Sequence, residues 1–189
     1  MTNTNDKLAS SLETNRFGTF GTTDDGRKTI RYTRSLDHPA EKVWRALTEK
    51  SELAAWFPEL NIEHTIGGSA ILNFSDGDCP PPENNPEDID YCTVTAFDPP
   101  SLLEYKGPTE EHRWEITPDG DRCTLVFITT LPLGERIQNS VACGWHYKID
   151  AMGWSLDGET FELEGFAGPM LTSIYFEYRK LYDEEDVKS

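Results

Sequence analysis

The sequence lacks any long hydrophobic run. None of its stretches approaches the roughly 20 consecutive apolar residues that a transmembrane helix requires. Residues 1–16 are polar and contain no apolar core of a signal peptide. We therefore expect no membrane span and a cytoplasmic protein.

Cysteine is scarce and scattered along the chain. The sequence has four cysteines, Cys79, Cys92, Cys123 and Cys143, and no C-x-x-C pair. This pattern indicates neither a zinc site nor a disulfide framework. We expect reduced thiols that act as small apolar side chains.

Basic residues are outnumbered by acidic ones. The chain has 17 Lys and Arg against 34 Asp and Glu, which gives a formal net charge of −17. A protein of this charge repels phosphate backbones, so we expect no nucleic-acid partner.

Recognisable catalytic and cofactor motifs are missing as well. The chain has no G-x-S-x-G, no G-x-x-x-x-G-K and no H-E-x-x-H, and we expect neither a metal nor a cofactor. General acid–base catalysis needs only one well-placed group and leaves no motif. A buried His or Glu such as His64, His112 or Glu104 therefore stays open as that group, and so does the question whether the protein is an enzyme.

Hydrophobic periodicity, which the chain does have, indicates one domain with two polar ends. Residues 1–15 show no periodicity, and we expect a disordered tail. A single domain should span residues 16–182, and residues 183–189 should form a frayed acidic end. A chain of this size can bury roughly 70% of its unfolded surface in one core.

The first part of this domain combines extended and helical patterns. Two extended stretches are expected within residues 16–36. One helix should begin at Pro39, and a second, shorter helix should be capped by Ser51 and end near Pro58.

From Leu60 onward the apolar period changes from about 3.6 to 2, which predicts an antiparallel meander. Its six strands are expected at residues 60–66, 69–75, 90–97, 101–107, 112–118 and 122–131. The acidic segment 75–90 is too long for a hairpin turn, and a solvated loop is favoured there over a calcium site.

A long helix is expected from about residue 135 to residue 157. Its apolar stripe consists of Ile137, Val141, Trp145, Ile149, Met152 and Leu156. The opposite side carries Cys143, Tyr147 and Trp154, so that side also needs cover. A terminal helix over residues 169–182 can supply it.

Helices set apart from an uninterrupted meander predict an α+β fold in the order β-α-α-β6-α. The expected architecture is a curved antiparallel β-sheet wrapped around the long C-terminal helix. A doubly wound parallel sheet does not fit this order.

Five runs of residues follow one another in a recognisable order: DHPAEKVWRALTEKSELAAWF, Gly67-Gly68, AFDPPSLLEY, WEITPDGDRCTLVF and GWHYKIDAMGWSLDGE. Together they resemble the START-like helix-grip (SRPBCC) superfamily and, within it, the family named for the heat-shock protein 90 ATPase activator. The resemblance covers residues 28–158 and leaves residues 159–182 as a helical extension. Where relatives often carry a histidine after the hydrophobic run of the last strand, this chain has Thr129-Thr130.

The resemblance implies a hydrophobic cavity between the sheet and the long helix. Relatives bind lipids, sterols, polyketides or hormones; one branch binds the chaperone, and another contains polyketide cyclases.

Strand parity and the helical stripe predict which side chains line this cavity. The candidate ligand-binding residues are Trp56, His64, Phe74, His112, Trp114, Phe127, Trp145 and His146. The histidines could orient a polar end of the ligand, or they could make ordinary hydrogen bonds to the backbone. The tryptophans could line a cavity or fill the core.

The leading hypothesis is a binder of a small apolar or aromatic ligand, such as a lipid, sterol or polyketide-like molecule. One alternative is a module that binds a chaperone, and another is a cyclase or lyase that uses a pocket His or Glu. The sequence leaves the ligand and the oligomeric state open.

Overall fold

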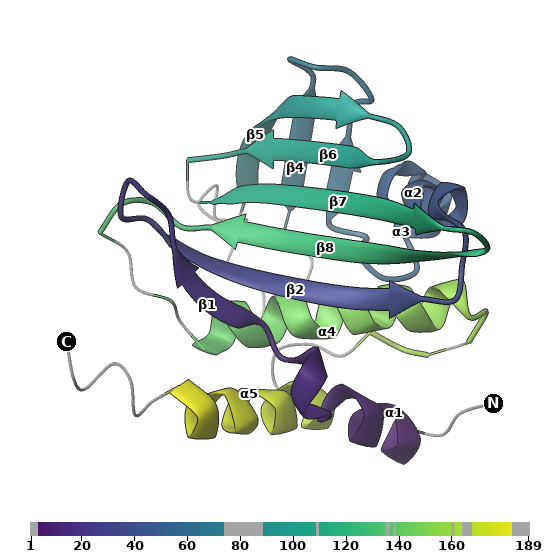
Figure 1. Ribbon diagram of the computed structural model, residues 1–189, viewed down its shortest axis with the longest axis vertical. Coiled ribbons are helices and arrows are strands. Elements are labelled where there is room, and N and C mark those ends of the chain that lie inside the picture. Colours follow the sequence, from purple (N-terminus) through teal and green to yellow (C-terminus); the bar gives the residue numbers. More distant parts are fainter. Residues whose placement is uncertain are drawn as a thin grey trace.

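The computed structural model describes residues 4–73, 89–108, 110–134, 137, 139–159, 161–163 and 168–182. These residues form one antiparallel sheet with helices on one side of it (Figure 1). The strands are β1 (Thr19–Thr22), β2 (Lys28–Leu36), β3 (Leu60–Ile62), β4 (Ser69–Asn73), β5 (Ile89–Asp98), β6 (Leu102–Lys106), β7 (Glu111–Asp119) and β8 (Arg122–Thr130).

The strand order is β1-β2-β8-β7-β6-β5-β4-β3, with neighbours antiparallel throughout. The meander from β3 to β8 is thus continuous, and β2 joins its last strand. This confirms the predicted α+β class and the helix-grip architecture. Residues 60–66 were expected to form one strand, but β3 ends at Ile62 because the chain turns there toward Gly67, which has a positive φ of 83°.

The helices are α1 (Thr4–Ser11), α2 (Ala40–Thr48), α3 (Lys50–Leu53), α4 (Asn139–Leu156) and α5 (Pro169–Tyr182), with a short 3-10 turn η1 at Thr14–Arg16. The long helix α4 crosses the sheet, and α2 and α3 lie at one end of it (Figure 1). Helices α1 and α5 lie on the side of α4 away from the sheet (Figure 1).

Both sides of α4 are buried, as its sequence predicts. Trp145, Ile149 and Met152 belong to the core below the sheet, and Cys143 lies on the side toward α5. The Sγ of Cys143 donates a hydrogen bond to the carbonyl oxygen of Leu171 on α5. The prediction that a terminal helix covers the second apolar side of the long helix is therefore confirmed.

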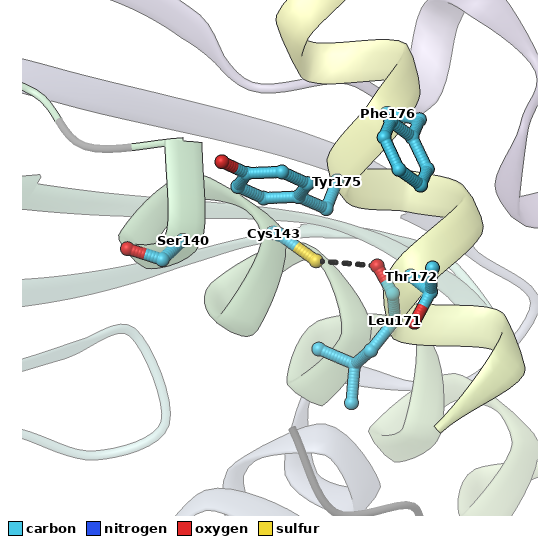
Figure 2. A pocket seen from close by; sticks show the side chains of 6 residues that line it. All are labelled: Ser140, Cys143, Leu171, Thr172, Tyr175 and Phe176. Atoms are coloured by element: carbon cyan, nitrogen blue, oxygen red, sulfur yellow. Dashed lines mark hydrogen bonds between the residues drawn. The ribbon is translucent and has the colours of Figure 1, made fainter. Parts of the chain in front are cut away.

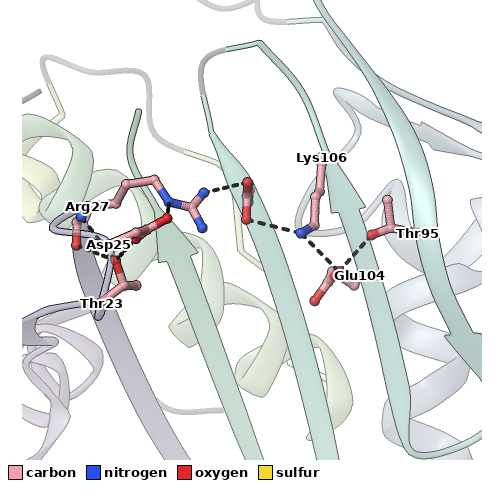
Figure 3. A network of polar contacts seen from close by, with 7 residues as sticks. Thr23, Asp25, Arg27, Thr95, Glu104 and Lys106 are labelled. Atoms are coloured by element: carbon pink, nitrogen blue, oxygen red, sulfur yellow. Dashed lines mark hydrogen bonds and ion pairs between the residues drawn. The ribbon is translucent and has the colours of Figure 1, made fainter. Parts of the chain in front are cut away.

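Alternation along the strands separates a buried face from a charged one. On β7, His112, Trp114 and Ile116 are buried, whereas the residues between them are more exposed. The exposed face carries a chain of ion pairs across the sheet (Figure 3). In it, Glu111 lies 2.5 Å from Arg27 and 3.3 Å from Lys106, and Lys106 also reaches Glu104.

The N-terminal segment departs from its predicted disorder. Residues 4–16 contain α1 and η1, and Leu8 and Leu12 pack against the core. The ammonium group of Lys7 is buried over the Trp154 ring and lies 3.0 Å from Glu159. These contacts come from distant parts of the chain, so local composition gave no sign of them. Residues 183–189, expected to fray, lie outside the described residues.

Two further expectations concern segments that are only partly described. Most of the acidic segment 75–90 lies outside the described residues, apart from its last two, which belong to β5. The described thiols of Cys92, Cys123 and Cys143 are free and buried, as predicted, and Cys79 is not described.

Across the described ranges, no helix combines the length and apolarity that crossing a bilayer requires. In the same part of the chain, no three His, Cys, Asp or Glu side chains converge as metal ligands would.

Candidate functional site

An aromatic cluster lies between β7, β8 and α4. Trp114 and Phe127 are paired across β7 and β8, and their ring centroids are 4.0 Å apart. The ring of Trp145 on α4 lies 4.6 Å from Phe127. Trp56, which follows α3, closes the cluster at 6.0 Å from Trp114, and its indole N–H donates to the Ala46 carbonyl. The structure therefore brings together these four predicted site residues, and His112, described next, is the fifth.

His112 lies in this cluster as a buried neutral base. Its ring is 4.8 Å from Trp145 and 5.0 Å from Tyr105, and only 1% of the residue is exposed. Burial lowers the pKa of His112 to about 3, because the charged form would lose its hydration. Among the described residues, Nδ1 of this ring has no hydrogen-bond partner.

Glu110 lies beside His112, and the sequence analysis missed it. Its Oε2 accepts hydrogen bonds from Thr129 Oγ1 at 2.8 Å and from Trp145 Nε1 at 3.3 Å. The same oxygen lies 3.7 Å from Nε2 of His112. Desolvation raises the pKa of Glu110, although both hydrogen bonds oppose the shift.

No Lys or Arg in the described part of the chain forms an ion pair with Glu110. The basic residue that lies beside it there is His112, which is neutral.

A signal for Glu110 was present in the sequence. The alternation that selected Trp114 and His112 continues two residues back to Glu110. Thr129, noted above as a departure from the relatives, supplies one of the donors to this carboxylate.

His146 was expected to face the ligand, but the structure places it toward α5 and the N-terminal segment. Its Nδ1 lies 3.1 Å from the Tyr178 hydroxyl, and its Nε2 lies 3.2 Å from Asp150 Oδ2. One residue along a helix turns the side chain by about 100°, so His146 and Trp145 serve different sides of α4. His146 therefore does not belong to the aromatic cluster, and its contact with a ligand stays a prediction.

Asp150 is the centre of a buried ionic network on that side of α4. It is fully buried, and its Oδ1 accepts hydrogen bonds from Arg16 Nη2 at 2.8 Å and Arg34 Nε at 3.0 Å. Burial by itself would raise the pKa of Asp150, but the charge of Arg34, with contributions from His146 and Arg16, lowers it overall. This network joins the N-terminal segment, β2 and α4.

His64 and Glu104 also lie away from the aromatic cluster. His64 sits in an exposed turn, where its Nε2 is 2.9 Å from the Thr48 carbonyl oxygen. Glu104 lies on the outer face of the sheet and accepts hydrogen bonds from Thr95 and Arg113. Desolvation opposes its ionisation, but these partners lower the pKa of Glu104 overall. Neither residue is the buried acid or base that the sequence left open, and Phe74 lies outside the described residues.

A second feature is a pocket between α4 and α5, on the far side of α4 from the sheet (Figure 2). Its volume is about 310 Å³, and its lining residues are Ser140, Cys143, Leu171, Thr172, Tyr175 and Phe176. Burial raises the pKa of the Cys143 thiol to about 12, so this cysteine is not a reactive thiolate at neutral pH.

The sheet wrapped on α4 defines the START-like helix-grip (SRPBCC) class. A sequence model of the family described as "Activator of Hsp90 ATPase homolog 1-like protein" matches residues 37–154. Because this match spans more than half of the 189 residues, the chain belongs to that family. A search of curated proteins found no match.

Several solved structures share the fold at low sequence identity. A conserved protein of unknown function, EF2215 from Enterococcus faecalis, is 19% identical with a TM-score of 0.69, and the likeness covers 96% of this chain and 98% of that one. CalU16 from Micromonospora echinospora is 20% identical with a TM-score of 0.66, covering 91% and 96%. DynU16, from the dynemicin biosynthetic locus, is 22% identical with a TM-score of 0.56, covering 68% and 47%.

Proposed function

We propose that the protein binds a small apolar or aromatic ligand at the aromatic cluster between the sheet and α4. The observation that carries this proposal is the cluster itself, in which large rings surround the carboxyl group of Glu110 and the imidazole of His112. Ligand sites for small molecules typically combine an apolar lining with a few placed polar groups. Membership of the family, whose fold typically binds small hydrophobic ligands, supports the same reading.

The position of Trp145 gives the ligand a place to enter. Trp145 is 8% exposed and the Glu110 side chain 19% exposed, whereas Trp114, Phe127 and His112 are almost fully buried. A ligand arriving from solvent therefore meets the Trp145 ring and the Glu110 carboxyl first. Aromatic stacking on an indole adds to the free energy gained by burying apolar area.

Native mass spectrometry of the freshly purified protein tests this proposal. The expected result is a non-covalent adduct on the order of a few hundred daltons, the mass of a ligand that a small pocket can hold, lost under denaturing conditions. In a Trp145→Ala variant the adduct should weaken, while a Trp154→Ala variant, changed on the other side of α4, should keep it. A bare protein mass, together with no thermal shift across lipids, sterols and polyphenols, would overturn the proposal.

A second candidate function is binding to a chaperone of the Hsp90 type, which the description of the family favours. Such binding needs an exposed surface and not an interior site. Purified chaperone should then co-elute with the protein and show a faster ATPase rate in its presence. An unchanged rate and separate elution would exclude this candidate and leave the ligand-binding proposal intact.

A further inference from the structure

Glu110 and His112 form a pair of hydrogen-bond acceptors that the protein itself does not fully use. Both donors to Glu110, Thr129 and Trp145, reach Oε2, and Oε1 receives no hydrogen bond from the described residues. The Nδ1 atom of His112 is likewise without a partner there. Buried polar atoms are normally paired, so an unpaired one beside a half-used carboxylate indicates a missing donor.

The tautomer of His112 makes Nδ1 an acceptor. Its Nε2 faces Oε2 of Glu110 at 3.7 Å, and a carboxylate oxygen favours a proton on the nitrogen that faces it. Nδ1 then carries the lone pair. Both unused atoms of the pair therefore call for a group that donates hydrogen bonds.

The charge around the pair limits what that group can be. Asp90, on β5, adds a second negative charge that acts on Glu110, and no Lys or Arg of the described chain forms an ion pair with the Glu110 carboxylate. An anionic head group, such as a fatty-acid carboxylate, would be repelled by these two acids. A neutral donor beside aromatic rings fits both the polarity and the lining of the site.

We propose that Glu110 and His112 bind the hydroxyl groups of a planar aromatic ligand, a phenol or an enol, whose ring stacks on Trp145. This inference rests on the proposed function and specifies its ligand class. The ring contributes apolar burial and stacking, while the hydroxyl donates to Oε1 of Glu110, which accepts no hydrogen bond from the described residues and belongs to a side chain that is 19% exposed. The Nδ1 of His112 is the second acceptor, on the ring whose Nε2 lies 3.7 Å from Oε2 of Glu110.

Isothermal titration with matched naphthalene probes tests the ligand class. Naphthalen-2-ol should bind about tenfold more tightly than 2-methoxynaphthalene, which has the same ring but no donor. Sodium 2-naphthoate should bind more weakly than either, because its carboxylate meets Glu110 and Asp90.

Variants at two neighbouring positions, Glu110 just before β7 and Glu111 at its first residue, provide the control. In Glu110→Gln, the preference for the hydroxyl probe should fall to about threefold or less, with binding of the methoxy probe little changed. The Glu111→Gln variant should keep the full preference, because Glu111 lies on the outer face and pairs with Arg27 and Lys106. A His112→Phe variant should lower the preference without abolishing ring binding.

The outcomes separate this inference from the function on which it rests. Equal affinity for the hydroxyl and methoxy probes, or an unchanged preference in Glu110→Gln, would overturn the hydroxyl class and leave ligand binding standing. Tighter binding of naphthalen-2-ylmethanamine, a cation, than of naphthalen-2-ol would also overturn it. Failure of every probe to bind, together with a bare mass in native spectra, would overturn both.

Discussion

The two sides of α4 differ in how a buried carboxylate is compensated. Toward α5 and the N-terminal segment, Asp150 is fully buried but lies within 3.0 Å of two guanidinium groups. Toward the sheet, Glu110 has no cationic partner among the described residues, and the neighbouring His112 leaves one nitrogen unpaired. Both sides contain a carboxylate next to a histidine, yet only one of them is charge-compensated.

This difference indicates which side is structural and which is free for a ligand. A buried charge that is paired stabilises one arrangement of the chain and is costly to break. A carboxylate that accepts hydrogen bonds at only one of its oxygens, among aromatic rings, contributes little to the free energy of folding. Its other oxygen remains available to a hydrogen-bond donor on a ligand. The same helix thus carries a structural network on one face and a candidate binding site on the other.

The largest effect is expected from breaking the ionic network. An Arg34→Met variant leaves Asp150 buried with one cation fewer and should lower the free energy of unfolding by about 3–5 kcal/mol. Urea denaturation measures this loss. Arg31→Met is the matched control, because Arg31 lies exposed on the same strand and its loss should change stability by about 0.5 kcal/mol or less. Equal losses in the two variants would contradict the structural role of the network.

A smaller loss is expected from removing one hydroxyl on the same side. The Tyr178 hydroxyl accepts a hydrogen bond from the Gly18 amide at 2.8 Å and lies beside His146. Tyr178→Phe should lower the free energy of unfolding by about 1–3 kcal/mol and speed exchange of the Gly18 amide proton. Tyr175→Phe, at a partly exposed position of the same helix, should do neither.

The two buried histidines should respond differently to the same substitution. His112→Phe removes an unpaired nitrogen from an aromatic environment, so the free energy of unfolding should stay constant or rise by about 1 kcal/mol. His146→Phe removes the contacts to Tyr178 and Asp150 and should lower it. Urea denaturation compares the two, and a loss above about 2 kcal/mol for His112→Phe would show that this ring has a structural partner.

The smallest expected effect is a pH dependence of opposite sign at the two carboxylates. The lowered pKa of Asp150 means that its contribution is present above the unfolded pKa of about 3.9 and is lost as pH falls below it. The raised pKa of Glu110 means that ionisation disfavours folding, so the wild type should gain stability relative to Glu110→Gln as pH falls from neutral toward about 4.3.

Denaturation of Asp150→Asn and Glu110→Gln between neutral and acid pH measures both dependences. Relative to Asp150→Asn the wild type should lose stability on acidification, and relative to Glu110→Gln it should gain. Slopes of the same sign would contradict the contrast between the two sides.

Most of the fold prediction was based on the periodicity of apolar residues. Alternation selected Trp114 and Phe127 for the buried face, and helical spacing selected Trp145 for the same cluster. The second apolar side of the long helix correctly predicted its cover by α5. The hydrophobic period predicts less well where a strand ends. The strand expected to run through His64 ends at Ile62, and the His64 side chain is exposed.

The periodicity of apolar residues did not predict the N-terminal helix or the polar part of the candidate site. The burial of Lys7 depends on Trp154 and Glu159, about 150 residues further along the chain. Alternation continues from His112 back to Glu110, but the sequence alone does not distinguish this carboxylate from the other acids of a chain that has 34 of them. Only its contacts with Thr129 and Trp145 identify it as part of a site.

The sequence by itself determined the α+β class, the meander, the long helix with its two apolar sides, and the aromatic residues between sheet and helix. It could do so because hydrophobic period is a local property of the chain. The tertiary structure alone decided which polar groups are compensated, since Asp150 meets Arg16 and Arg34 through space and Glu110 meets no cation in the described chain. Charge compensation depends on distances between residues far apart in sequence, and no local pattern records those distances.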